Sequence, residues 1–134
     1  MAGYSGTPLA QKLGIKDGLT VAVLDEPKGF RAQLVGLPDD VTFRTQLRGR
    51  IDIVIGFFVE RRKFEQRLSA VTRTMERDGS WWVCWPKKAA RVPTDMTEDV
   101  VREVVLPVGL VDVKVAAIDD VWSGLKVMWR KSMR

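Results

Sequence analysis

The sequence predicts one α/β domain of Rossmann-like, three-layer build, with a mostly parallel sheet between helical layers and an antiparallel hairpin at its end. Apolar runs rich in β-branched residues alternate with amphipathic helical patterns, as in successive βαβ units. The last two apolar runs, residues 110–118 and 125–130, are separated by a short turn, which is typical of an antiparallel pair. The length of 134 residues suits a single core, so the predicted domain spans residues 1–134.

The first third of the chain predicts two short helices and two strands. Thr7 followed by Pro8 is typical of a helix start, because a capping hydroxyl precedes a proline at the first helical position. Residues 19–25 are β-rich and follow a Lys-Asp-Gly turn signal, which predicts a strand. A short helix is expected over residues 29–35. Residues 41–47 alternate between apolar and polar side chains, as in a strand with one wetter face.

Two buried strands and two helices are predicted before the hairpin. Residues 51–59 are mostly apolar and β-branched or aromatic, as expected of a central parallel strand. Apolar side chains recur at helical spacing over residues 64–75, which predicts an amphipathic helix. Residues 80–86 are interpreted as a second buried strand. Two acids after Thr97 favour a helix start, since they oppose the positive end of the helix dipole, and Pro107 closes that helix.

The composition, with 46% hydrophobic and 29% charged residues, is that of an ordinary globular protein. No stretch reaches the ~18 to 20 continuous apolar residues that a membrane helix needs, so no membrane partner is expected. The first 13 residues lack the basic start and apolar run of a signal peptide. These features predict a cytoplasmic location.

Two residue counts restrict the chemistry of this chain. The absence of histidine removes Ser-His-Asp and Cys-His catalysis, the usual general base near neutral pH and the commonest metal ligand. The single cysteine, Cys84, lies in an apolar run and is interpreted as a buried strand thiol. The sequence therefore predicts no catalytic residue and no metal site. These residue counts favour a protein that is not an enzyme.

Residues 12–18, leading into residues 21–25, are similar to the entry of class I methyltransferases, and the later order of elements is similar as well. Over nearly its whole length the chain also resembles an uncharacterised bacterial family of domains of unknown function. The segments that carry this second resemblance are Gly3-Tyr4-Ser5-Gly6-Thr7-Pro8-Leu9, Trp85-Pro86-Lys87-Lys88, Thr94-Asp95 with Thr97-Glu98, Gly109-Leu110-Val111-Asp112-Val113-Lys114 and Trp122-Ser123-Gly124-Leu125-Lys126. The resemblance implies a methyltransferase-like sheet and brings no established activity with it.

The methyltransferase layout implies the strand order second, first, third, fourth, sixth, fifth, with the sixth strand antiparallel. The pattern leaves open whether residues 41–59 supply one strand or two to the main sheet. The expected ligand crevice lies beyond the carboxyl ends of the first strand and its neighbour, where the winding of the sheet reverses.

The glycines and the acid that hold a nucleotide cofactor in such sheets are missing. After the first strand, Pro27 stands where close approach of the backbone is needed, and only Gly29 remains of a glycine-rich loop. Between Asp40 and Asp52, where a ribose-binding acid is expected, the charged residues are Arg44, Arg48 and Arg50. The sequence therefore predicts no cofactor of the S-adenosylmethionine or NAD kind, and it contains no P-loop.

Aromatic and basic side chains are expected at the carboxyl edge of the sheet. Trp85, Lys87, Lys88, Trp122 and Ser123 could line a cleft with two indoles and several cations, which suits a flat or anionic ligand. The alternative is that the indoles pack in the core and the lysines are solvated.

Arg61 opens a run of three cations at the expected start of a helix. Cations in the first turn oppose the helix dipole, so an anion bound there would offset their cost. The helix could instead begin one or two residues later. Arg61 completes the set of candidate ligand-binding residues.

The function that these observations favour is a non-catalytic, methyltransferase-like domain that binds a small anionic ligand or a protein partner. One alternative is a divergent S-adenosylmethionine-dependent methyltransferase. The other follows from the net charge of +5 and is a nucleic-acid-binding protein. Its cations are Arg44, Arg48, Arg50, Arg61, Arg62, Arg130, Lys131 and Arg134.

Overall fold

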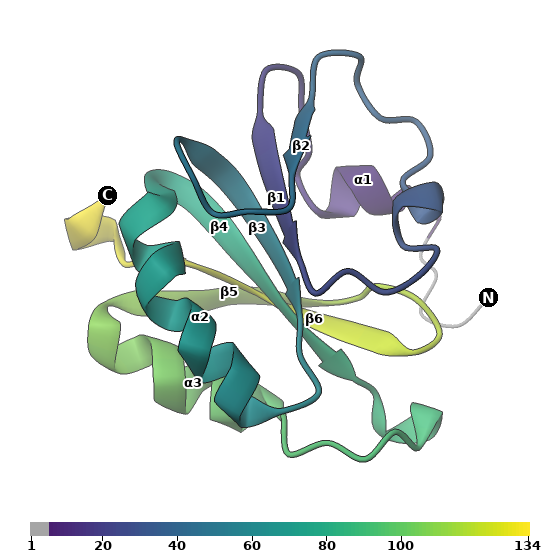
Figure 1. Cartoon of the computed structure of the whole chain (residues 1–134), viewed down its shortest axis with the longest axis vertical. Coiled ribbons are helices and arrows are strands. Elements are labelled where there is room, and N and C mark those ends of the chain that lie inside the picture. The colour runs from purple at the N-terminus through teal and green to yellow at the C-terminus, as the bar shows by residue number, and fades with distance from the viewer. Residues whose placement is uncertain (1–5) are drawn as a thin grey trace.

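Six strands form one sheet in the order β2-β1-β3-β4-β6-β5 (Figure 1). The computed structural model describes residues 6–134, so Gly3, Tyr4 and Ser5 of the first resemblance segment lie outside the described residues. In chain order the strands are β1 (Thr20–Leu24), β2 (Thr42–Arg44), β3 (Ile51–Phe57), β4 (Met75–Pro86), β5 (Leu110–Ala117) and β6 (Trp122–Trp129). The first four strands are parallel, and β6 is antiparallel to both of its neighbours. This confirms the predicted order, with two strands drawn from residues 41–59.

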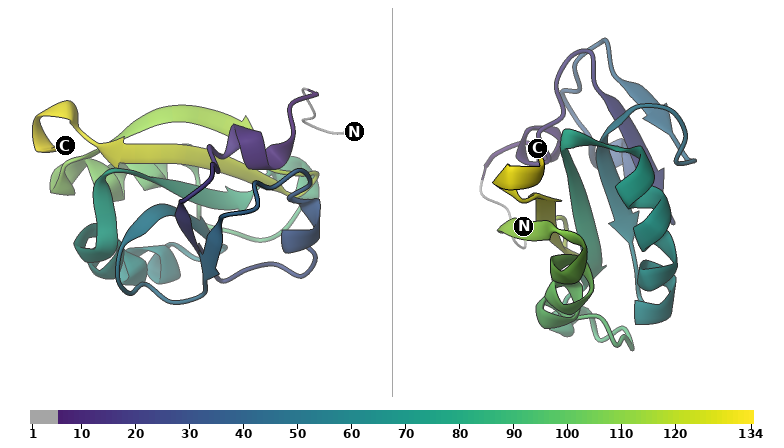
Figure 2. Two further views of the ribbon diagram at one scale, coloured as in Figure 1. Left: turned by 90° about the horizontal axis from the view of Figure 1, so that it is seen from above. Right: turned by 90° about the vertical axis from the view of Figure 1, so that its left-hand side faces the viewer.

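Helical layers lie on both sides of the sheet, as the three-layer prediction requires. The helices α2 (Arg61–Thr74) and α3 (Glu98–Val105) lie together on one face (Figures 1 and 2). The other face is covered by α1 (Leu9–Lys12) and by the segment between β1 and β2, which holds the 3-10 turn η1 (Arg31–Gln33). Further 3-10 turns are η2 (Lys88–Ala90), η3 (Leu106–Val108) and η4 (Lys131–Met133). Among residues 6–134, no helix has the length and apolar character to cross a bilayer.

The buried residues form one core on each face of the sheet. Trp81 belongs to the core under α2 and α3, and its neighbour Trp82 to the core under α1, because successive strand residues point to opposite faces. Both indoles are fully buried. We call these two clusters the α2-side core and the α1-side core.

The helical pattern read from the sequence corresponds to the faces that the helices bury. Phe64 and Val71, seven residues apart on α2, are fully buried against the sheet. In α3 the buried side chains include Val101 and Val104, and the hydroxyl of Thr97 caps the first turn by accepting a hydrogen bond from the N–H of residue 100 at 3.1 Å. Burying each of these side chains contributes about 1.5–3 kcal/mol, so packing rather than propensity holds the helices in place.

The segment between β1 and β3 is less regular than its sequence pattern indicates. The helix expected over residues 29–35 is reduced to the single turn of η1, because Gly29 and Gly36 on either side have positive φ and leave too few residues for a stable helix. The strand expected over residues 41–47 ends at Arg44. The chain then leaves the sheet, and Leu47 packs against the α2-side core.

Two other strands are longer than predicted. β4 begins at Met75 instead of residue 80, so the Asp-Gly pair at residues 78–79 lies inside the strand and not in a turn. Gly79 permits this, because a Cβ there would lie 2.7 Å from the backbone oxygen of Asp52. β6 begins at Trp122 because the Asp119 carboxylate accepts two backbone hydrogen bonds of 2.8 Å, from the N–H groups of residues 121 and 122, and tightens the turn.

Candidate functional site

The carboxyl ends of the parallel strands meet at one edge of the sheet. Leu24, Phe57 and Pro86 end β1, β3 and β4 there, and the antiparallel β6 begins at the same edge with Trp122 opposite Pro86. Open α/β sheets hold their ligands at this edge, where the winding reverses. We call it the carboxyl edge.

The winding reverses beside β1. The connection from β1 to β2 crosses the α1 side, where Phe30 and Leu34 are buried, whereas the connection from β2 to β3 crosses the α2 side through Leu47. The crevice expected at such a reversal therefore lies between the ends of β1 and β3.

Aromatic rings pack against the α1 side of this crevice. The ring of Phe30 lies 4.8 Å from that of Phe57, and the ring of Phe57 lies 5.1 Å from that of Trp122, both in edge-to-face geometry. Phe30 is 1% exposed and Phe57 is 4% exposed. A residue of the loop after β1 thus packs directly on the last residue of β3.

The loop after β1 is held by its own ion pairs. Asp25, which directly follows β1 and has a left-handed conformation with φ of 54°, pairs with Arg67 of α2 at 3.7 Å. Glu26 pairs with Arg31 at 3.0 Å. Pro27 has no N–H to donate, so the loop has one backbone donor fewer than a glycine-rich loop of the same length.

A pocket of about 580 Å³ lies at the end of β4, between η2 and the start of α3. We call it the β4 pocket. It is lined by Trp85, Pro86, Lys87, Lys88, Arg91, Val92, Pro93, Thr94, Met96, Thr97 and Glu98. The carboxylate of Glu98 is engaged by Arg102 at 2.6 Å. Lys87, Lys88 and Arg91 contact no carboxylate within the described part of the chain. The pocket therefore carries an excess of positive charge.

The loop that forms the rim of the β4 pocket is fastened to the start of α2. The backbone N–H of Arg61 donates a hydrogen bond of 2.7 Å to the carboxylate of Asp95, and the hydroxyl of Thr94 donates to the carbonyl of Val59. The anion that the sequence suggested for this helix terminus is thus supplied by the chain itself.

Arg61 is engaged in ion pairs away from the β4 pocket. Its guanidinium lies 2.9 Å from Glu103 and 3.5 Å from Glu65. The hydrogen bond to Glu103 is the main cause that raises the pKa of Arg61. The side chain links α2 to α3.

The cleft with two indoles that the sequence suggested is not formed. Trp85 belongs to the α2-side core and Trp122 packs against the α1-side core, so their rings lie on opposite faces of the sheet. Ser123 stands opposite Trp85 in the register of β4 and β6, which places Trp122 one residue out of phase. The structure brings Trp85, Lys87 and Lys88 into one pocket and leaves Trp122, Ser123 and Arg61 outside it.

The sequence interpretation missed Arg91 and Thr94 as members of this pocket. The signal that could have found Arg91 is a run of three cations within five residues, at 87, 88 and 91, in a connection between a buried strand and a helix. Arg91 has a left-handed backbone with φ of 55°, which closes η2 and turns the chain along the pocket.

The eight cations proposed for nucleic-acid binding differ in whether they have acidic partners. Arg50 contacts Asp52 and Glu76, and Arg62 lies 3.8 Å from Glu60. With Arg61 also paired, three of the eight are engaged by carboxylates.

The fold is that of the methyltransferases. Among solved structures, the mitomycin 7-O-methyltransferase MmcR superposes with a TM-score of 0.64 at 10% identity, covering 92% of this chain and 53% of that one. Magnesium protoporphyrin IX methyltransferase (ChlM) from Synechocystis PCC 6803, with bound SAM, gives 0.59 at 14% identity, covering 91% and 74%. A SAM-dependent methyltransferase from Aquifex aeolicus gives 0.59 at 13% identity, covering 91% and 88%.

The chain spans about half the length of MmcR. No family model matches the sequence, and no curated protein matches it either. The likeness is therefore one of architecture, and the resemblance to a bacterial family of unknown function stays a prediction.

The residues at the carboxyl edge do not fit an adenosine-bearing cofactor such as S-adenosylmethionine. Pro27 interrupts the loop that would have to approach the ligand, and Phe30 fills space beside the end of β3. At the end of β2, where a carboxylate would bind the ribose hydroxyls, the side chain is that of Arg44.

Proposed function

We propose that this chain is a non-catalytic domain of methyltransferase fold that binds a small anionic ligand in the β4 pocket. The observation that carries the proposal is the group of three cations without carboxylate partners, Lys87, Lys88 and Arg91, around a pocket of about 580 Å³. A pocket of this size suits a metabolite. A cytoplasmic location is part of the proposal, since the single cysteine is a free thiol.

The positive charge of the β4 pocket favours an anionic ligand over a neutral one. Positive charges that converge without a counterion repel one another, and a bound anion changes that repulsion into attraction. The buried Met96 and Trp85 provide an apolar floor, while the hydroxyl of Thr94 lies on the rim. A concave pocket favours a small molecule over a protein partner, because flat surfaces are the usual form of protein interfaces.

The chemistry of the chain supports a binding role. The thiol of Cys84 is fully buried, and burial raises its pKa, so it is a poor nucleophile.

The test is a calorimetric screen of di- and tricarboxylates, phosphate esters and sulfate against the wild type and the Lys87→Gln/Lys88→Gln/Arg91→Gln variant. We expect at least one anion to bind the wild type and to lose about tenfold or more in affinity in the variant. The control is Lys28→Gln/Lys131→Gln, which removes two exposed cations elsewhere. Equal affinity in the wild type and the triple variant would contradict the proposal.

A divergent S-adenosylmethionine-dependent methyltransferase is the second candidate. It is favoured by the solved structures of similar fold, which include a magnesium protoporphyrin IX methyltransferase with bound SAM. Titration of the chain with S-adenosylmethionine and with S-adenosylhomocysteine distinguishes the two candidates. Micromolar binding of either would favour the methyltransferase, and no heat of binding would favour the anion-binding domain.

A further inference from the structure

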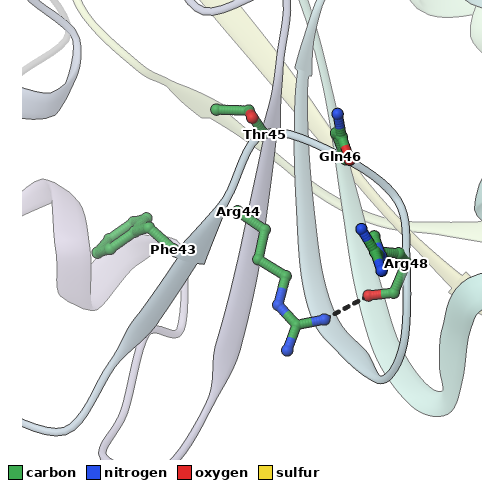
Figure 3. A pocket seen from close by; sticks show the side chains of 5 residues that line it. All are labelled: Phe43, Arg44, Thr45, Gln46 and Arg48. Carbon is green, nitrogen blue, oxygen red and sulfur yellow. Dashed lines mark hydrogen bonds between the residues drawn. The ribbon is translucent and has the colours of Figure 1, made fainter.

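We infer that the chain has a second ligand site, at the carboxyl end of β2, which binds the phosphate group of a small phosphorylated molecule. A pocket of about 570 Å³ lies there and is lined by Phe43, Arg44, Thr45, Gln46 and Arg48 (Figure 3). We call it the β2 pocket. It lies three strand positions from the β4 pocket, or about 14 Å at the usual strand spacing, so the two sites are separate.

The two arginines of the β2 pocket are among those of the described residues that have no acidic partner. Six others pair with carboxylates, namely Arg31, Arg50, Arg61, Arg62, Arg67 and Arg102. Within residues 6–134, neither Arg44 nor Arg48 forms an ion pair, and no acid lines the pocket. The charges of both guanidinium groups thus remain available to an anion from solution.

The loop after β2 is shaped around the guanidinium of Arg44. That group donates a hydrogen bond to the backbone carbonyl of Arg48, which holds the two arginines on one short loop (Figure 3). Gly49 has a positive φ of 69°, and a Cβ there would lie only 2.8 Å from the Nη1 atom of Arg44. Glycine at this position permits the left-handed backbone and leaves space beside the guanidinium of Arg44.

The donors of the β2 pocket match a phosphate group. A guanidinium presents its N–H groups as a planar fork that binds two phosphate oxygens at once, and two such groups match the charge of a dianion. The Thr45 hydroxyl and the Gln46 amide add donors that suit the hydroxyl groups of a sugar.

The wall of the β2 pocket is apolar on one side. Arg31 lies over the ring of Phe43 at 4.2 Å, but its charge is engaged by Glu26. In nucleotide-binding sheets an acid after the second strand accepts hydrogen bonds from the ribose hydroxyls, whereas an arginine nearby donates hydrogen bonds to a phosphate. The arginine pair at the end of β2 therefore favours a phosphorylated ligand.

The experiment is a titration of the ¹⁵N-labelled full chain, followed by amide chemical shifts, first with inorganic phosphate and then with ribose 5-phosphate. We expect the amide signals of residues 43–49 to move, and the affinity to fall about tenfold or more in Arg48→Gln and in Arg44→Gln. Gly49→Ala should weaken binding as well, because it displaces Arg44. Arg62→Gln, which removes an exposed arginine elsewhere, should bind as the wild type does.

The two titrants distinguish the sources of the phosphate. Tighter binding of ribose 5-phosphate assigns the site to a phosphorylated metabolite, and equal binding assigns it to free phosphate. Unmoved signals for residues 43–49 at millimolar concentrations of both would overturn the inference, as would unchanged affinity in Arg48→Gln. Arg48 is exposed, so this variant should fold. Lys87→Gln, in the β4 pocket, should leave the titration unchanged. Loss of binding in the β2 pocket can therefore be distinguished from loss of binding in the β4 pocket.

Discussion

The carboxylate of Asp95 accepts a hydrogen bond of 2.7 Å from the backbone N–H of Arg61, across 34 residues of sequence. Glu60, which precedes α2, makes no side-chain cap, and the first turn of α2 contains no acid. Asp95 therefore acts as the capping anion of a helix to which it does not belong. It also anchors the loop that borders the β4 pocket.

Replacing Asp95 with alanine should lower the free energy of unfolding by about 1 kcal/mol, the usual cost of a lost helix cap. Asp95→Asn keeps an oxygen acceptor and loses only the charge, so it should cost less. Urea denaturation of both variants measures the difference. Equal stability of the wild type and the alanine variant would mean that the hydrogen bond contributes nothing to folding.

The elements of this fold could be predicted where the sequence pattern is local. The mostly apolar run of residues 51–59 predicted the central strand β3, and the acids after Thr97 predicted the start of α3. The strand order was predicted from the resemblance to methyltransferases and is confirmed.

The candidate site could be predicted only in part, because it depends on register and on tertiary contacts. Pairing of Trp85 with Ser123 decides that Trp122 points to the other face, and no sequence pattern fixes that pairing. Likewise, the capping of Arg61 by Asp95 links two elements far apart in the chain. The lysines that follow β4 were found because a residue directly after a buried strand must reach the carboxyl edge.

Lys114 and Lys126 stand directly opposite each other on β5 and β6. Burial lowers the pKa of Lys126, and the charges of Lys114, Lys16 and Arg134 lower it further. Replacing Lys114 with glutamate should change a repulsive cross-strand pair into an attractive one and stabilise the fold by about 0.2–1 kcal/mol. Thermal or urea unfolding measures the gain, and Lys28→Glu controls for the change in net charge. A loss of stability specific to Lys114→Glu would contradict this account.

Cys84 predicts a dependence of stability on alkaline pH. Burial, and then the charge of Asp119, raises the pKa of the folded thiol far above its ordinary value of 9.0. Above about pH 9 the unfolded chain loses this proton while the folded chain keeps it, so the unfolding free energy should fall by up to about 1.4 kcal/mol per pH unit.

The measurement for Cys84 is a series of urea unfolding curves between neutral pH and pH 10. Cys84→Ala leaves a small cavity, so its absolute stability is lower, but the part of the pH slope that comes from the thiol should disappear. The quantity to compare between the wild type and Cys84→Ala is therefore the slope of the unfolding free energy against pH. Parallel pH profiles for the two proteins would mean that the thiol ionises equally in both states.

Phe30 should be a major contributor to the stability of the carboxyl edge. Its ring is buried against Phe57 at 4.8 Å, and Phe57 in turn contacts Trp122. Phe30→Ala should cost about 3–5 kcal/mol, since it removes the transfer free energy of the ring and leaves a cavity. Phe43→Ala, at a half-buried position on the edge strand, should cost clearly less.

The same substitution tests why the chain does not fit an adenosine-bearing cofactor. If Phe30 alone blocked the crevice, Phe30→Ala would gain affinity for S-adenosylmethionine. We expect no gain, because Pro27 still removes a backbone donor and Arg44 still stands where a ribose-binding carboxylate is required. Calorimetric titration of the folded variant decides the matter. A newly formed site would show that the ring, and not the loop, separates this domain from a cofactor-binding methyltransferase.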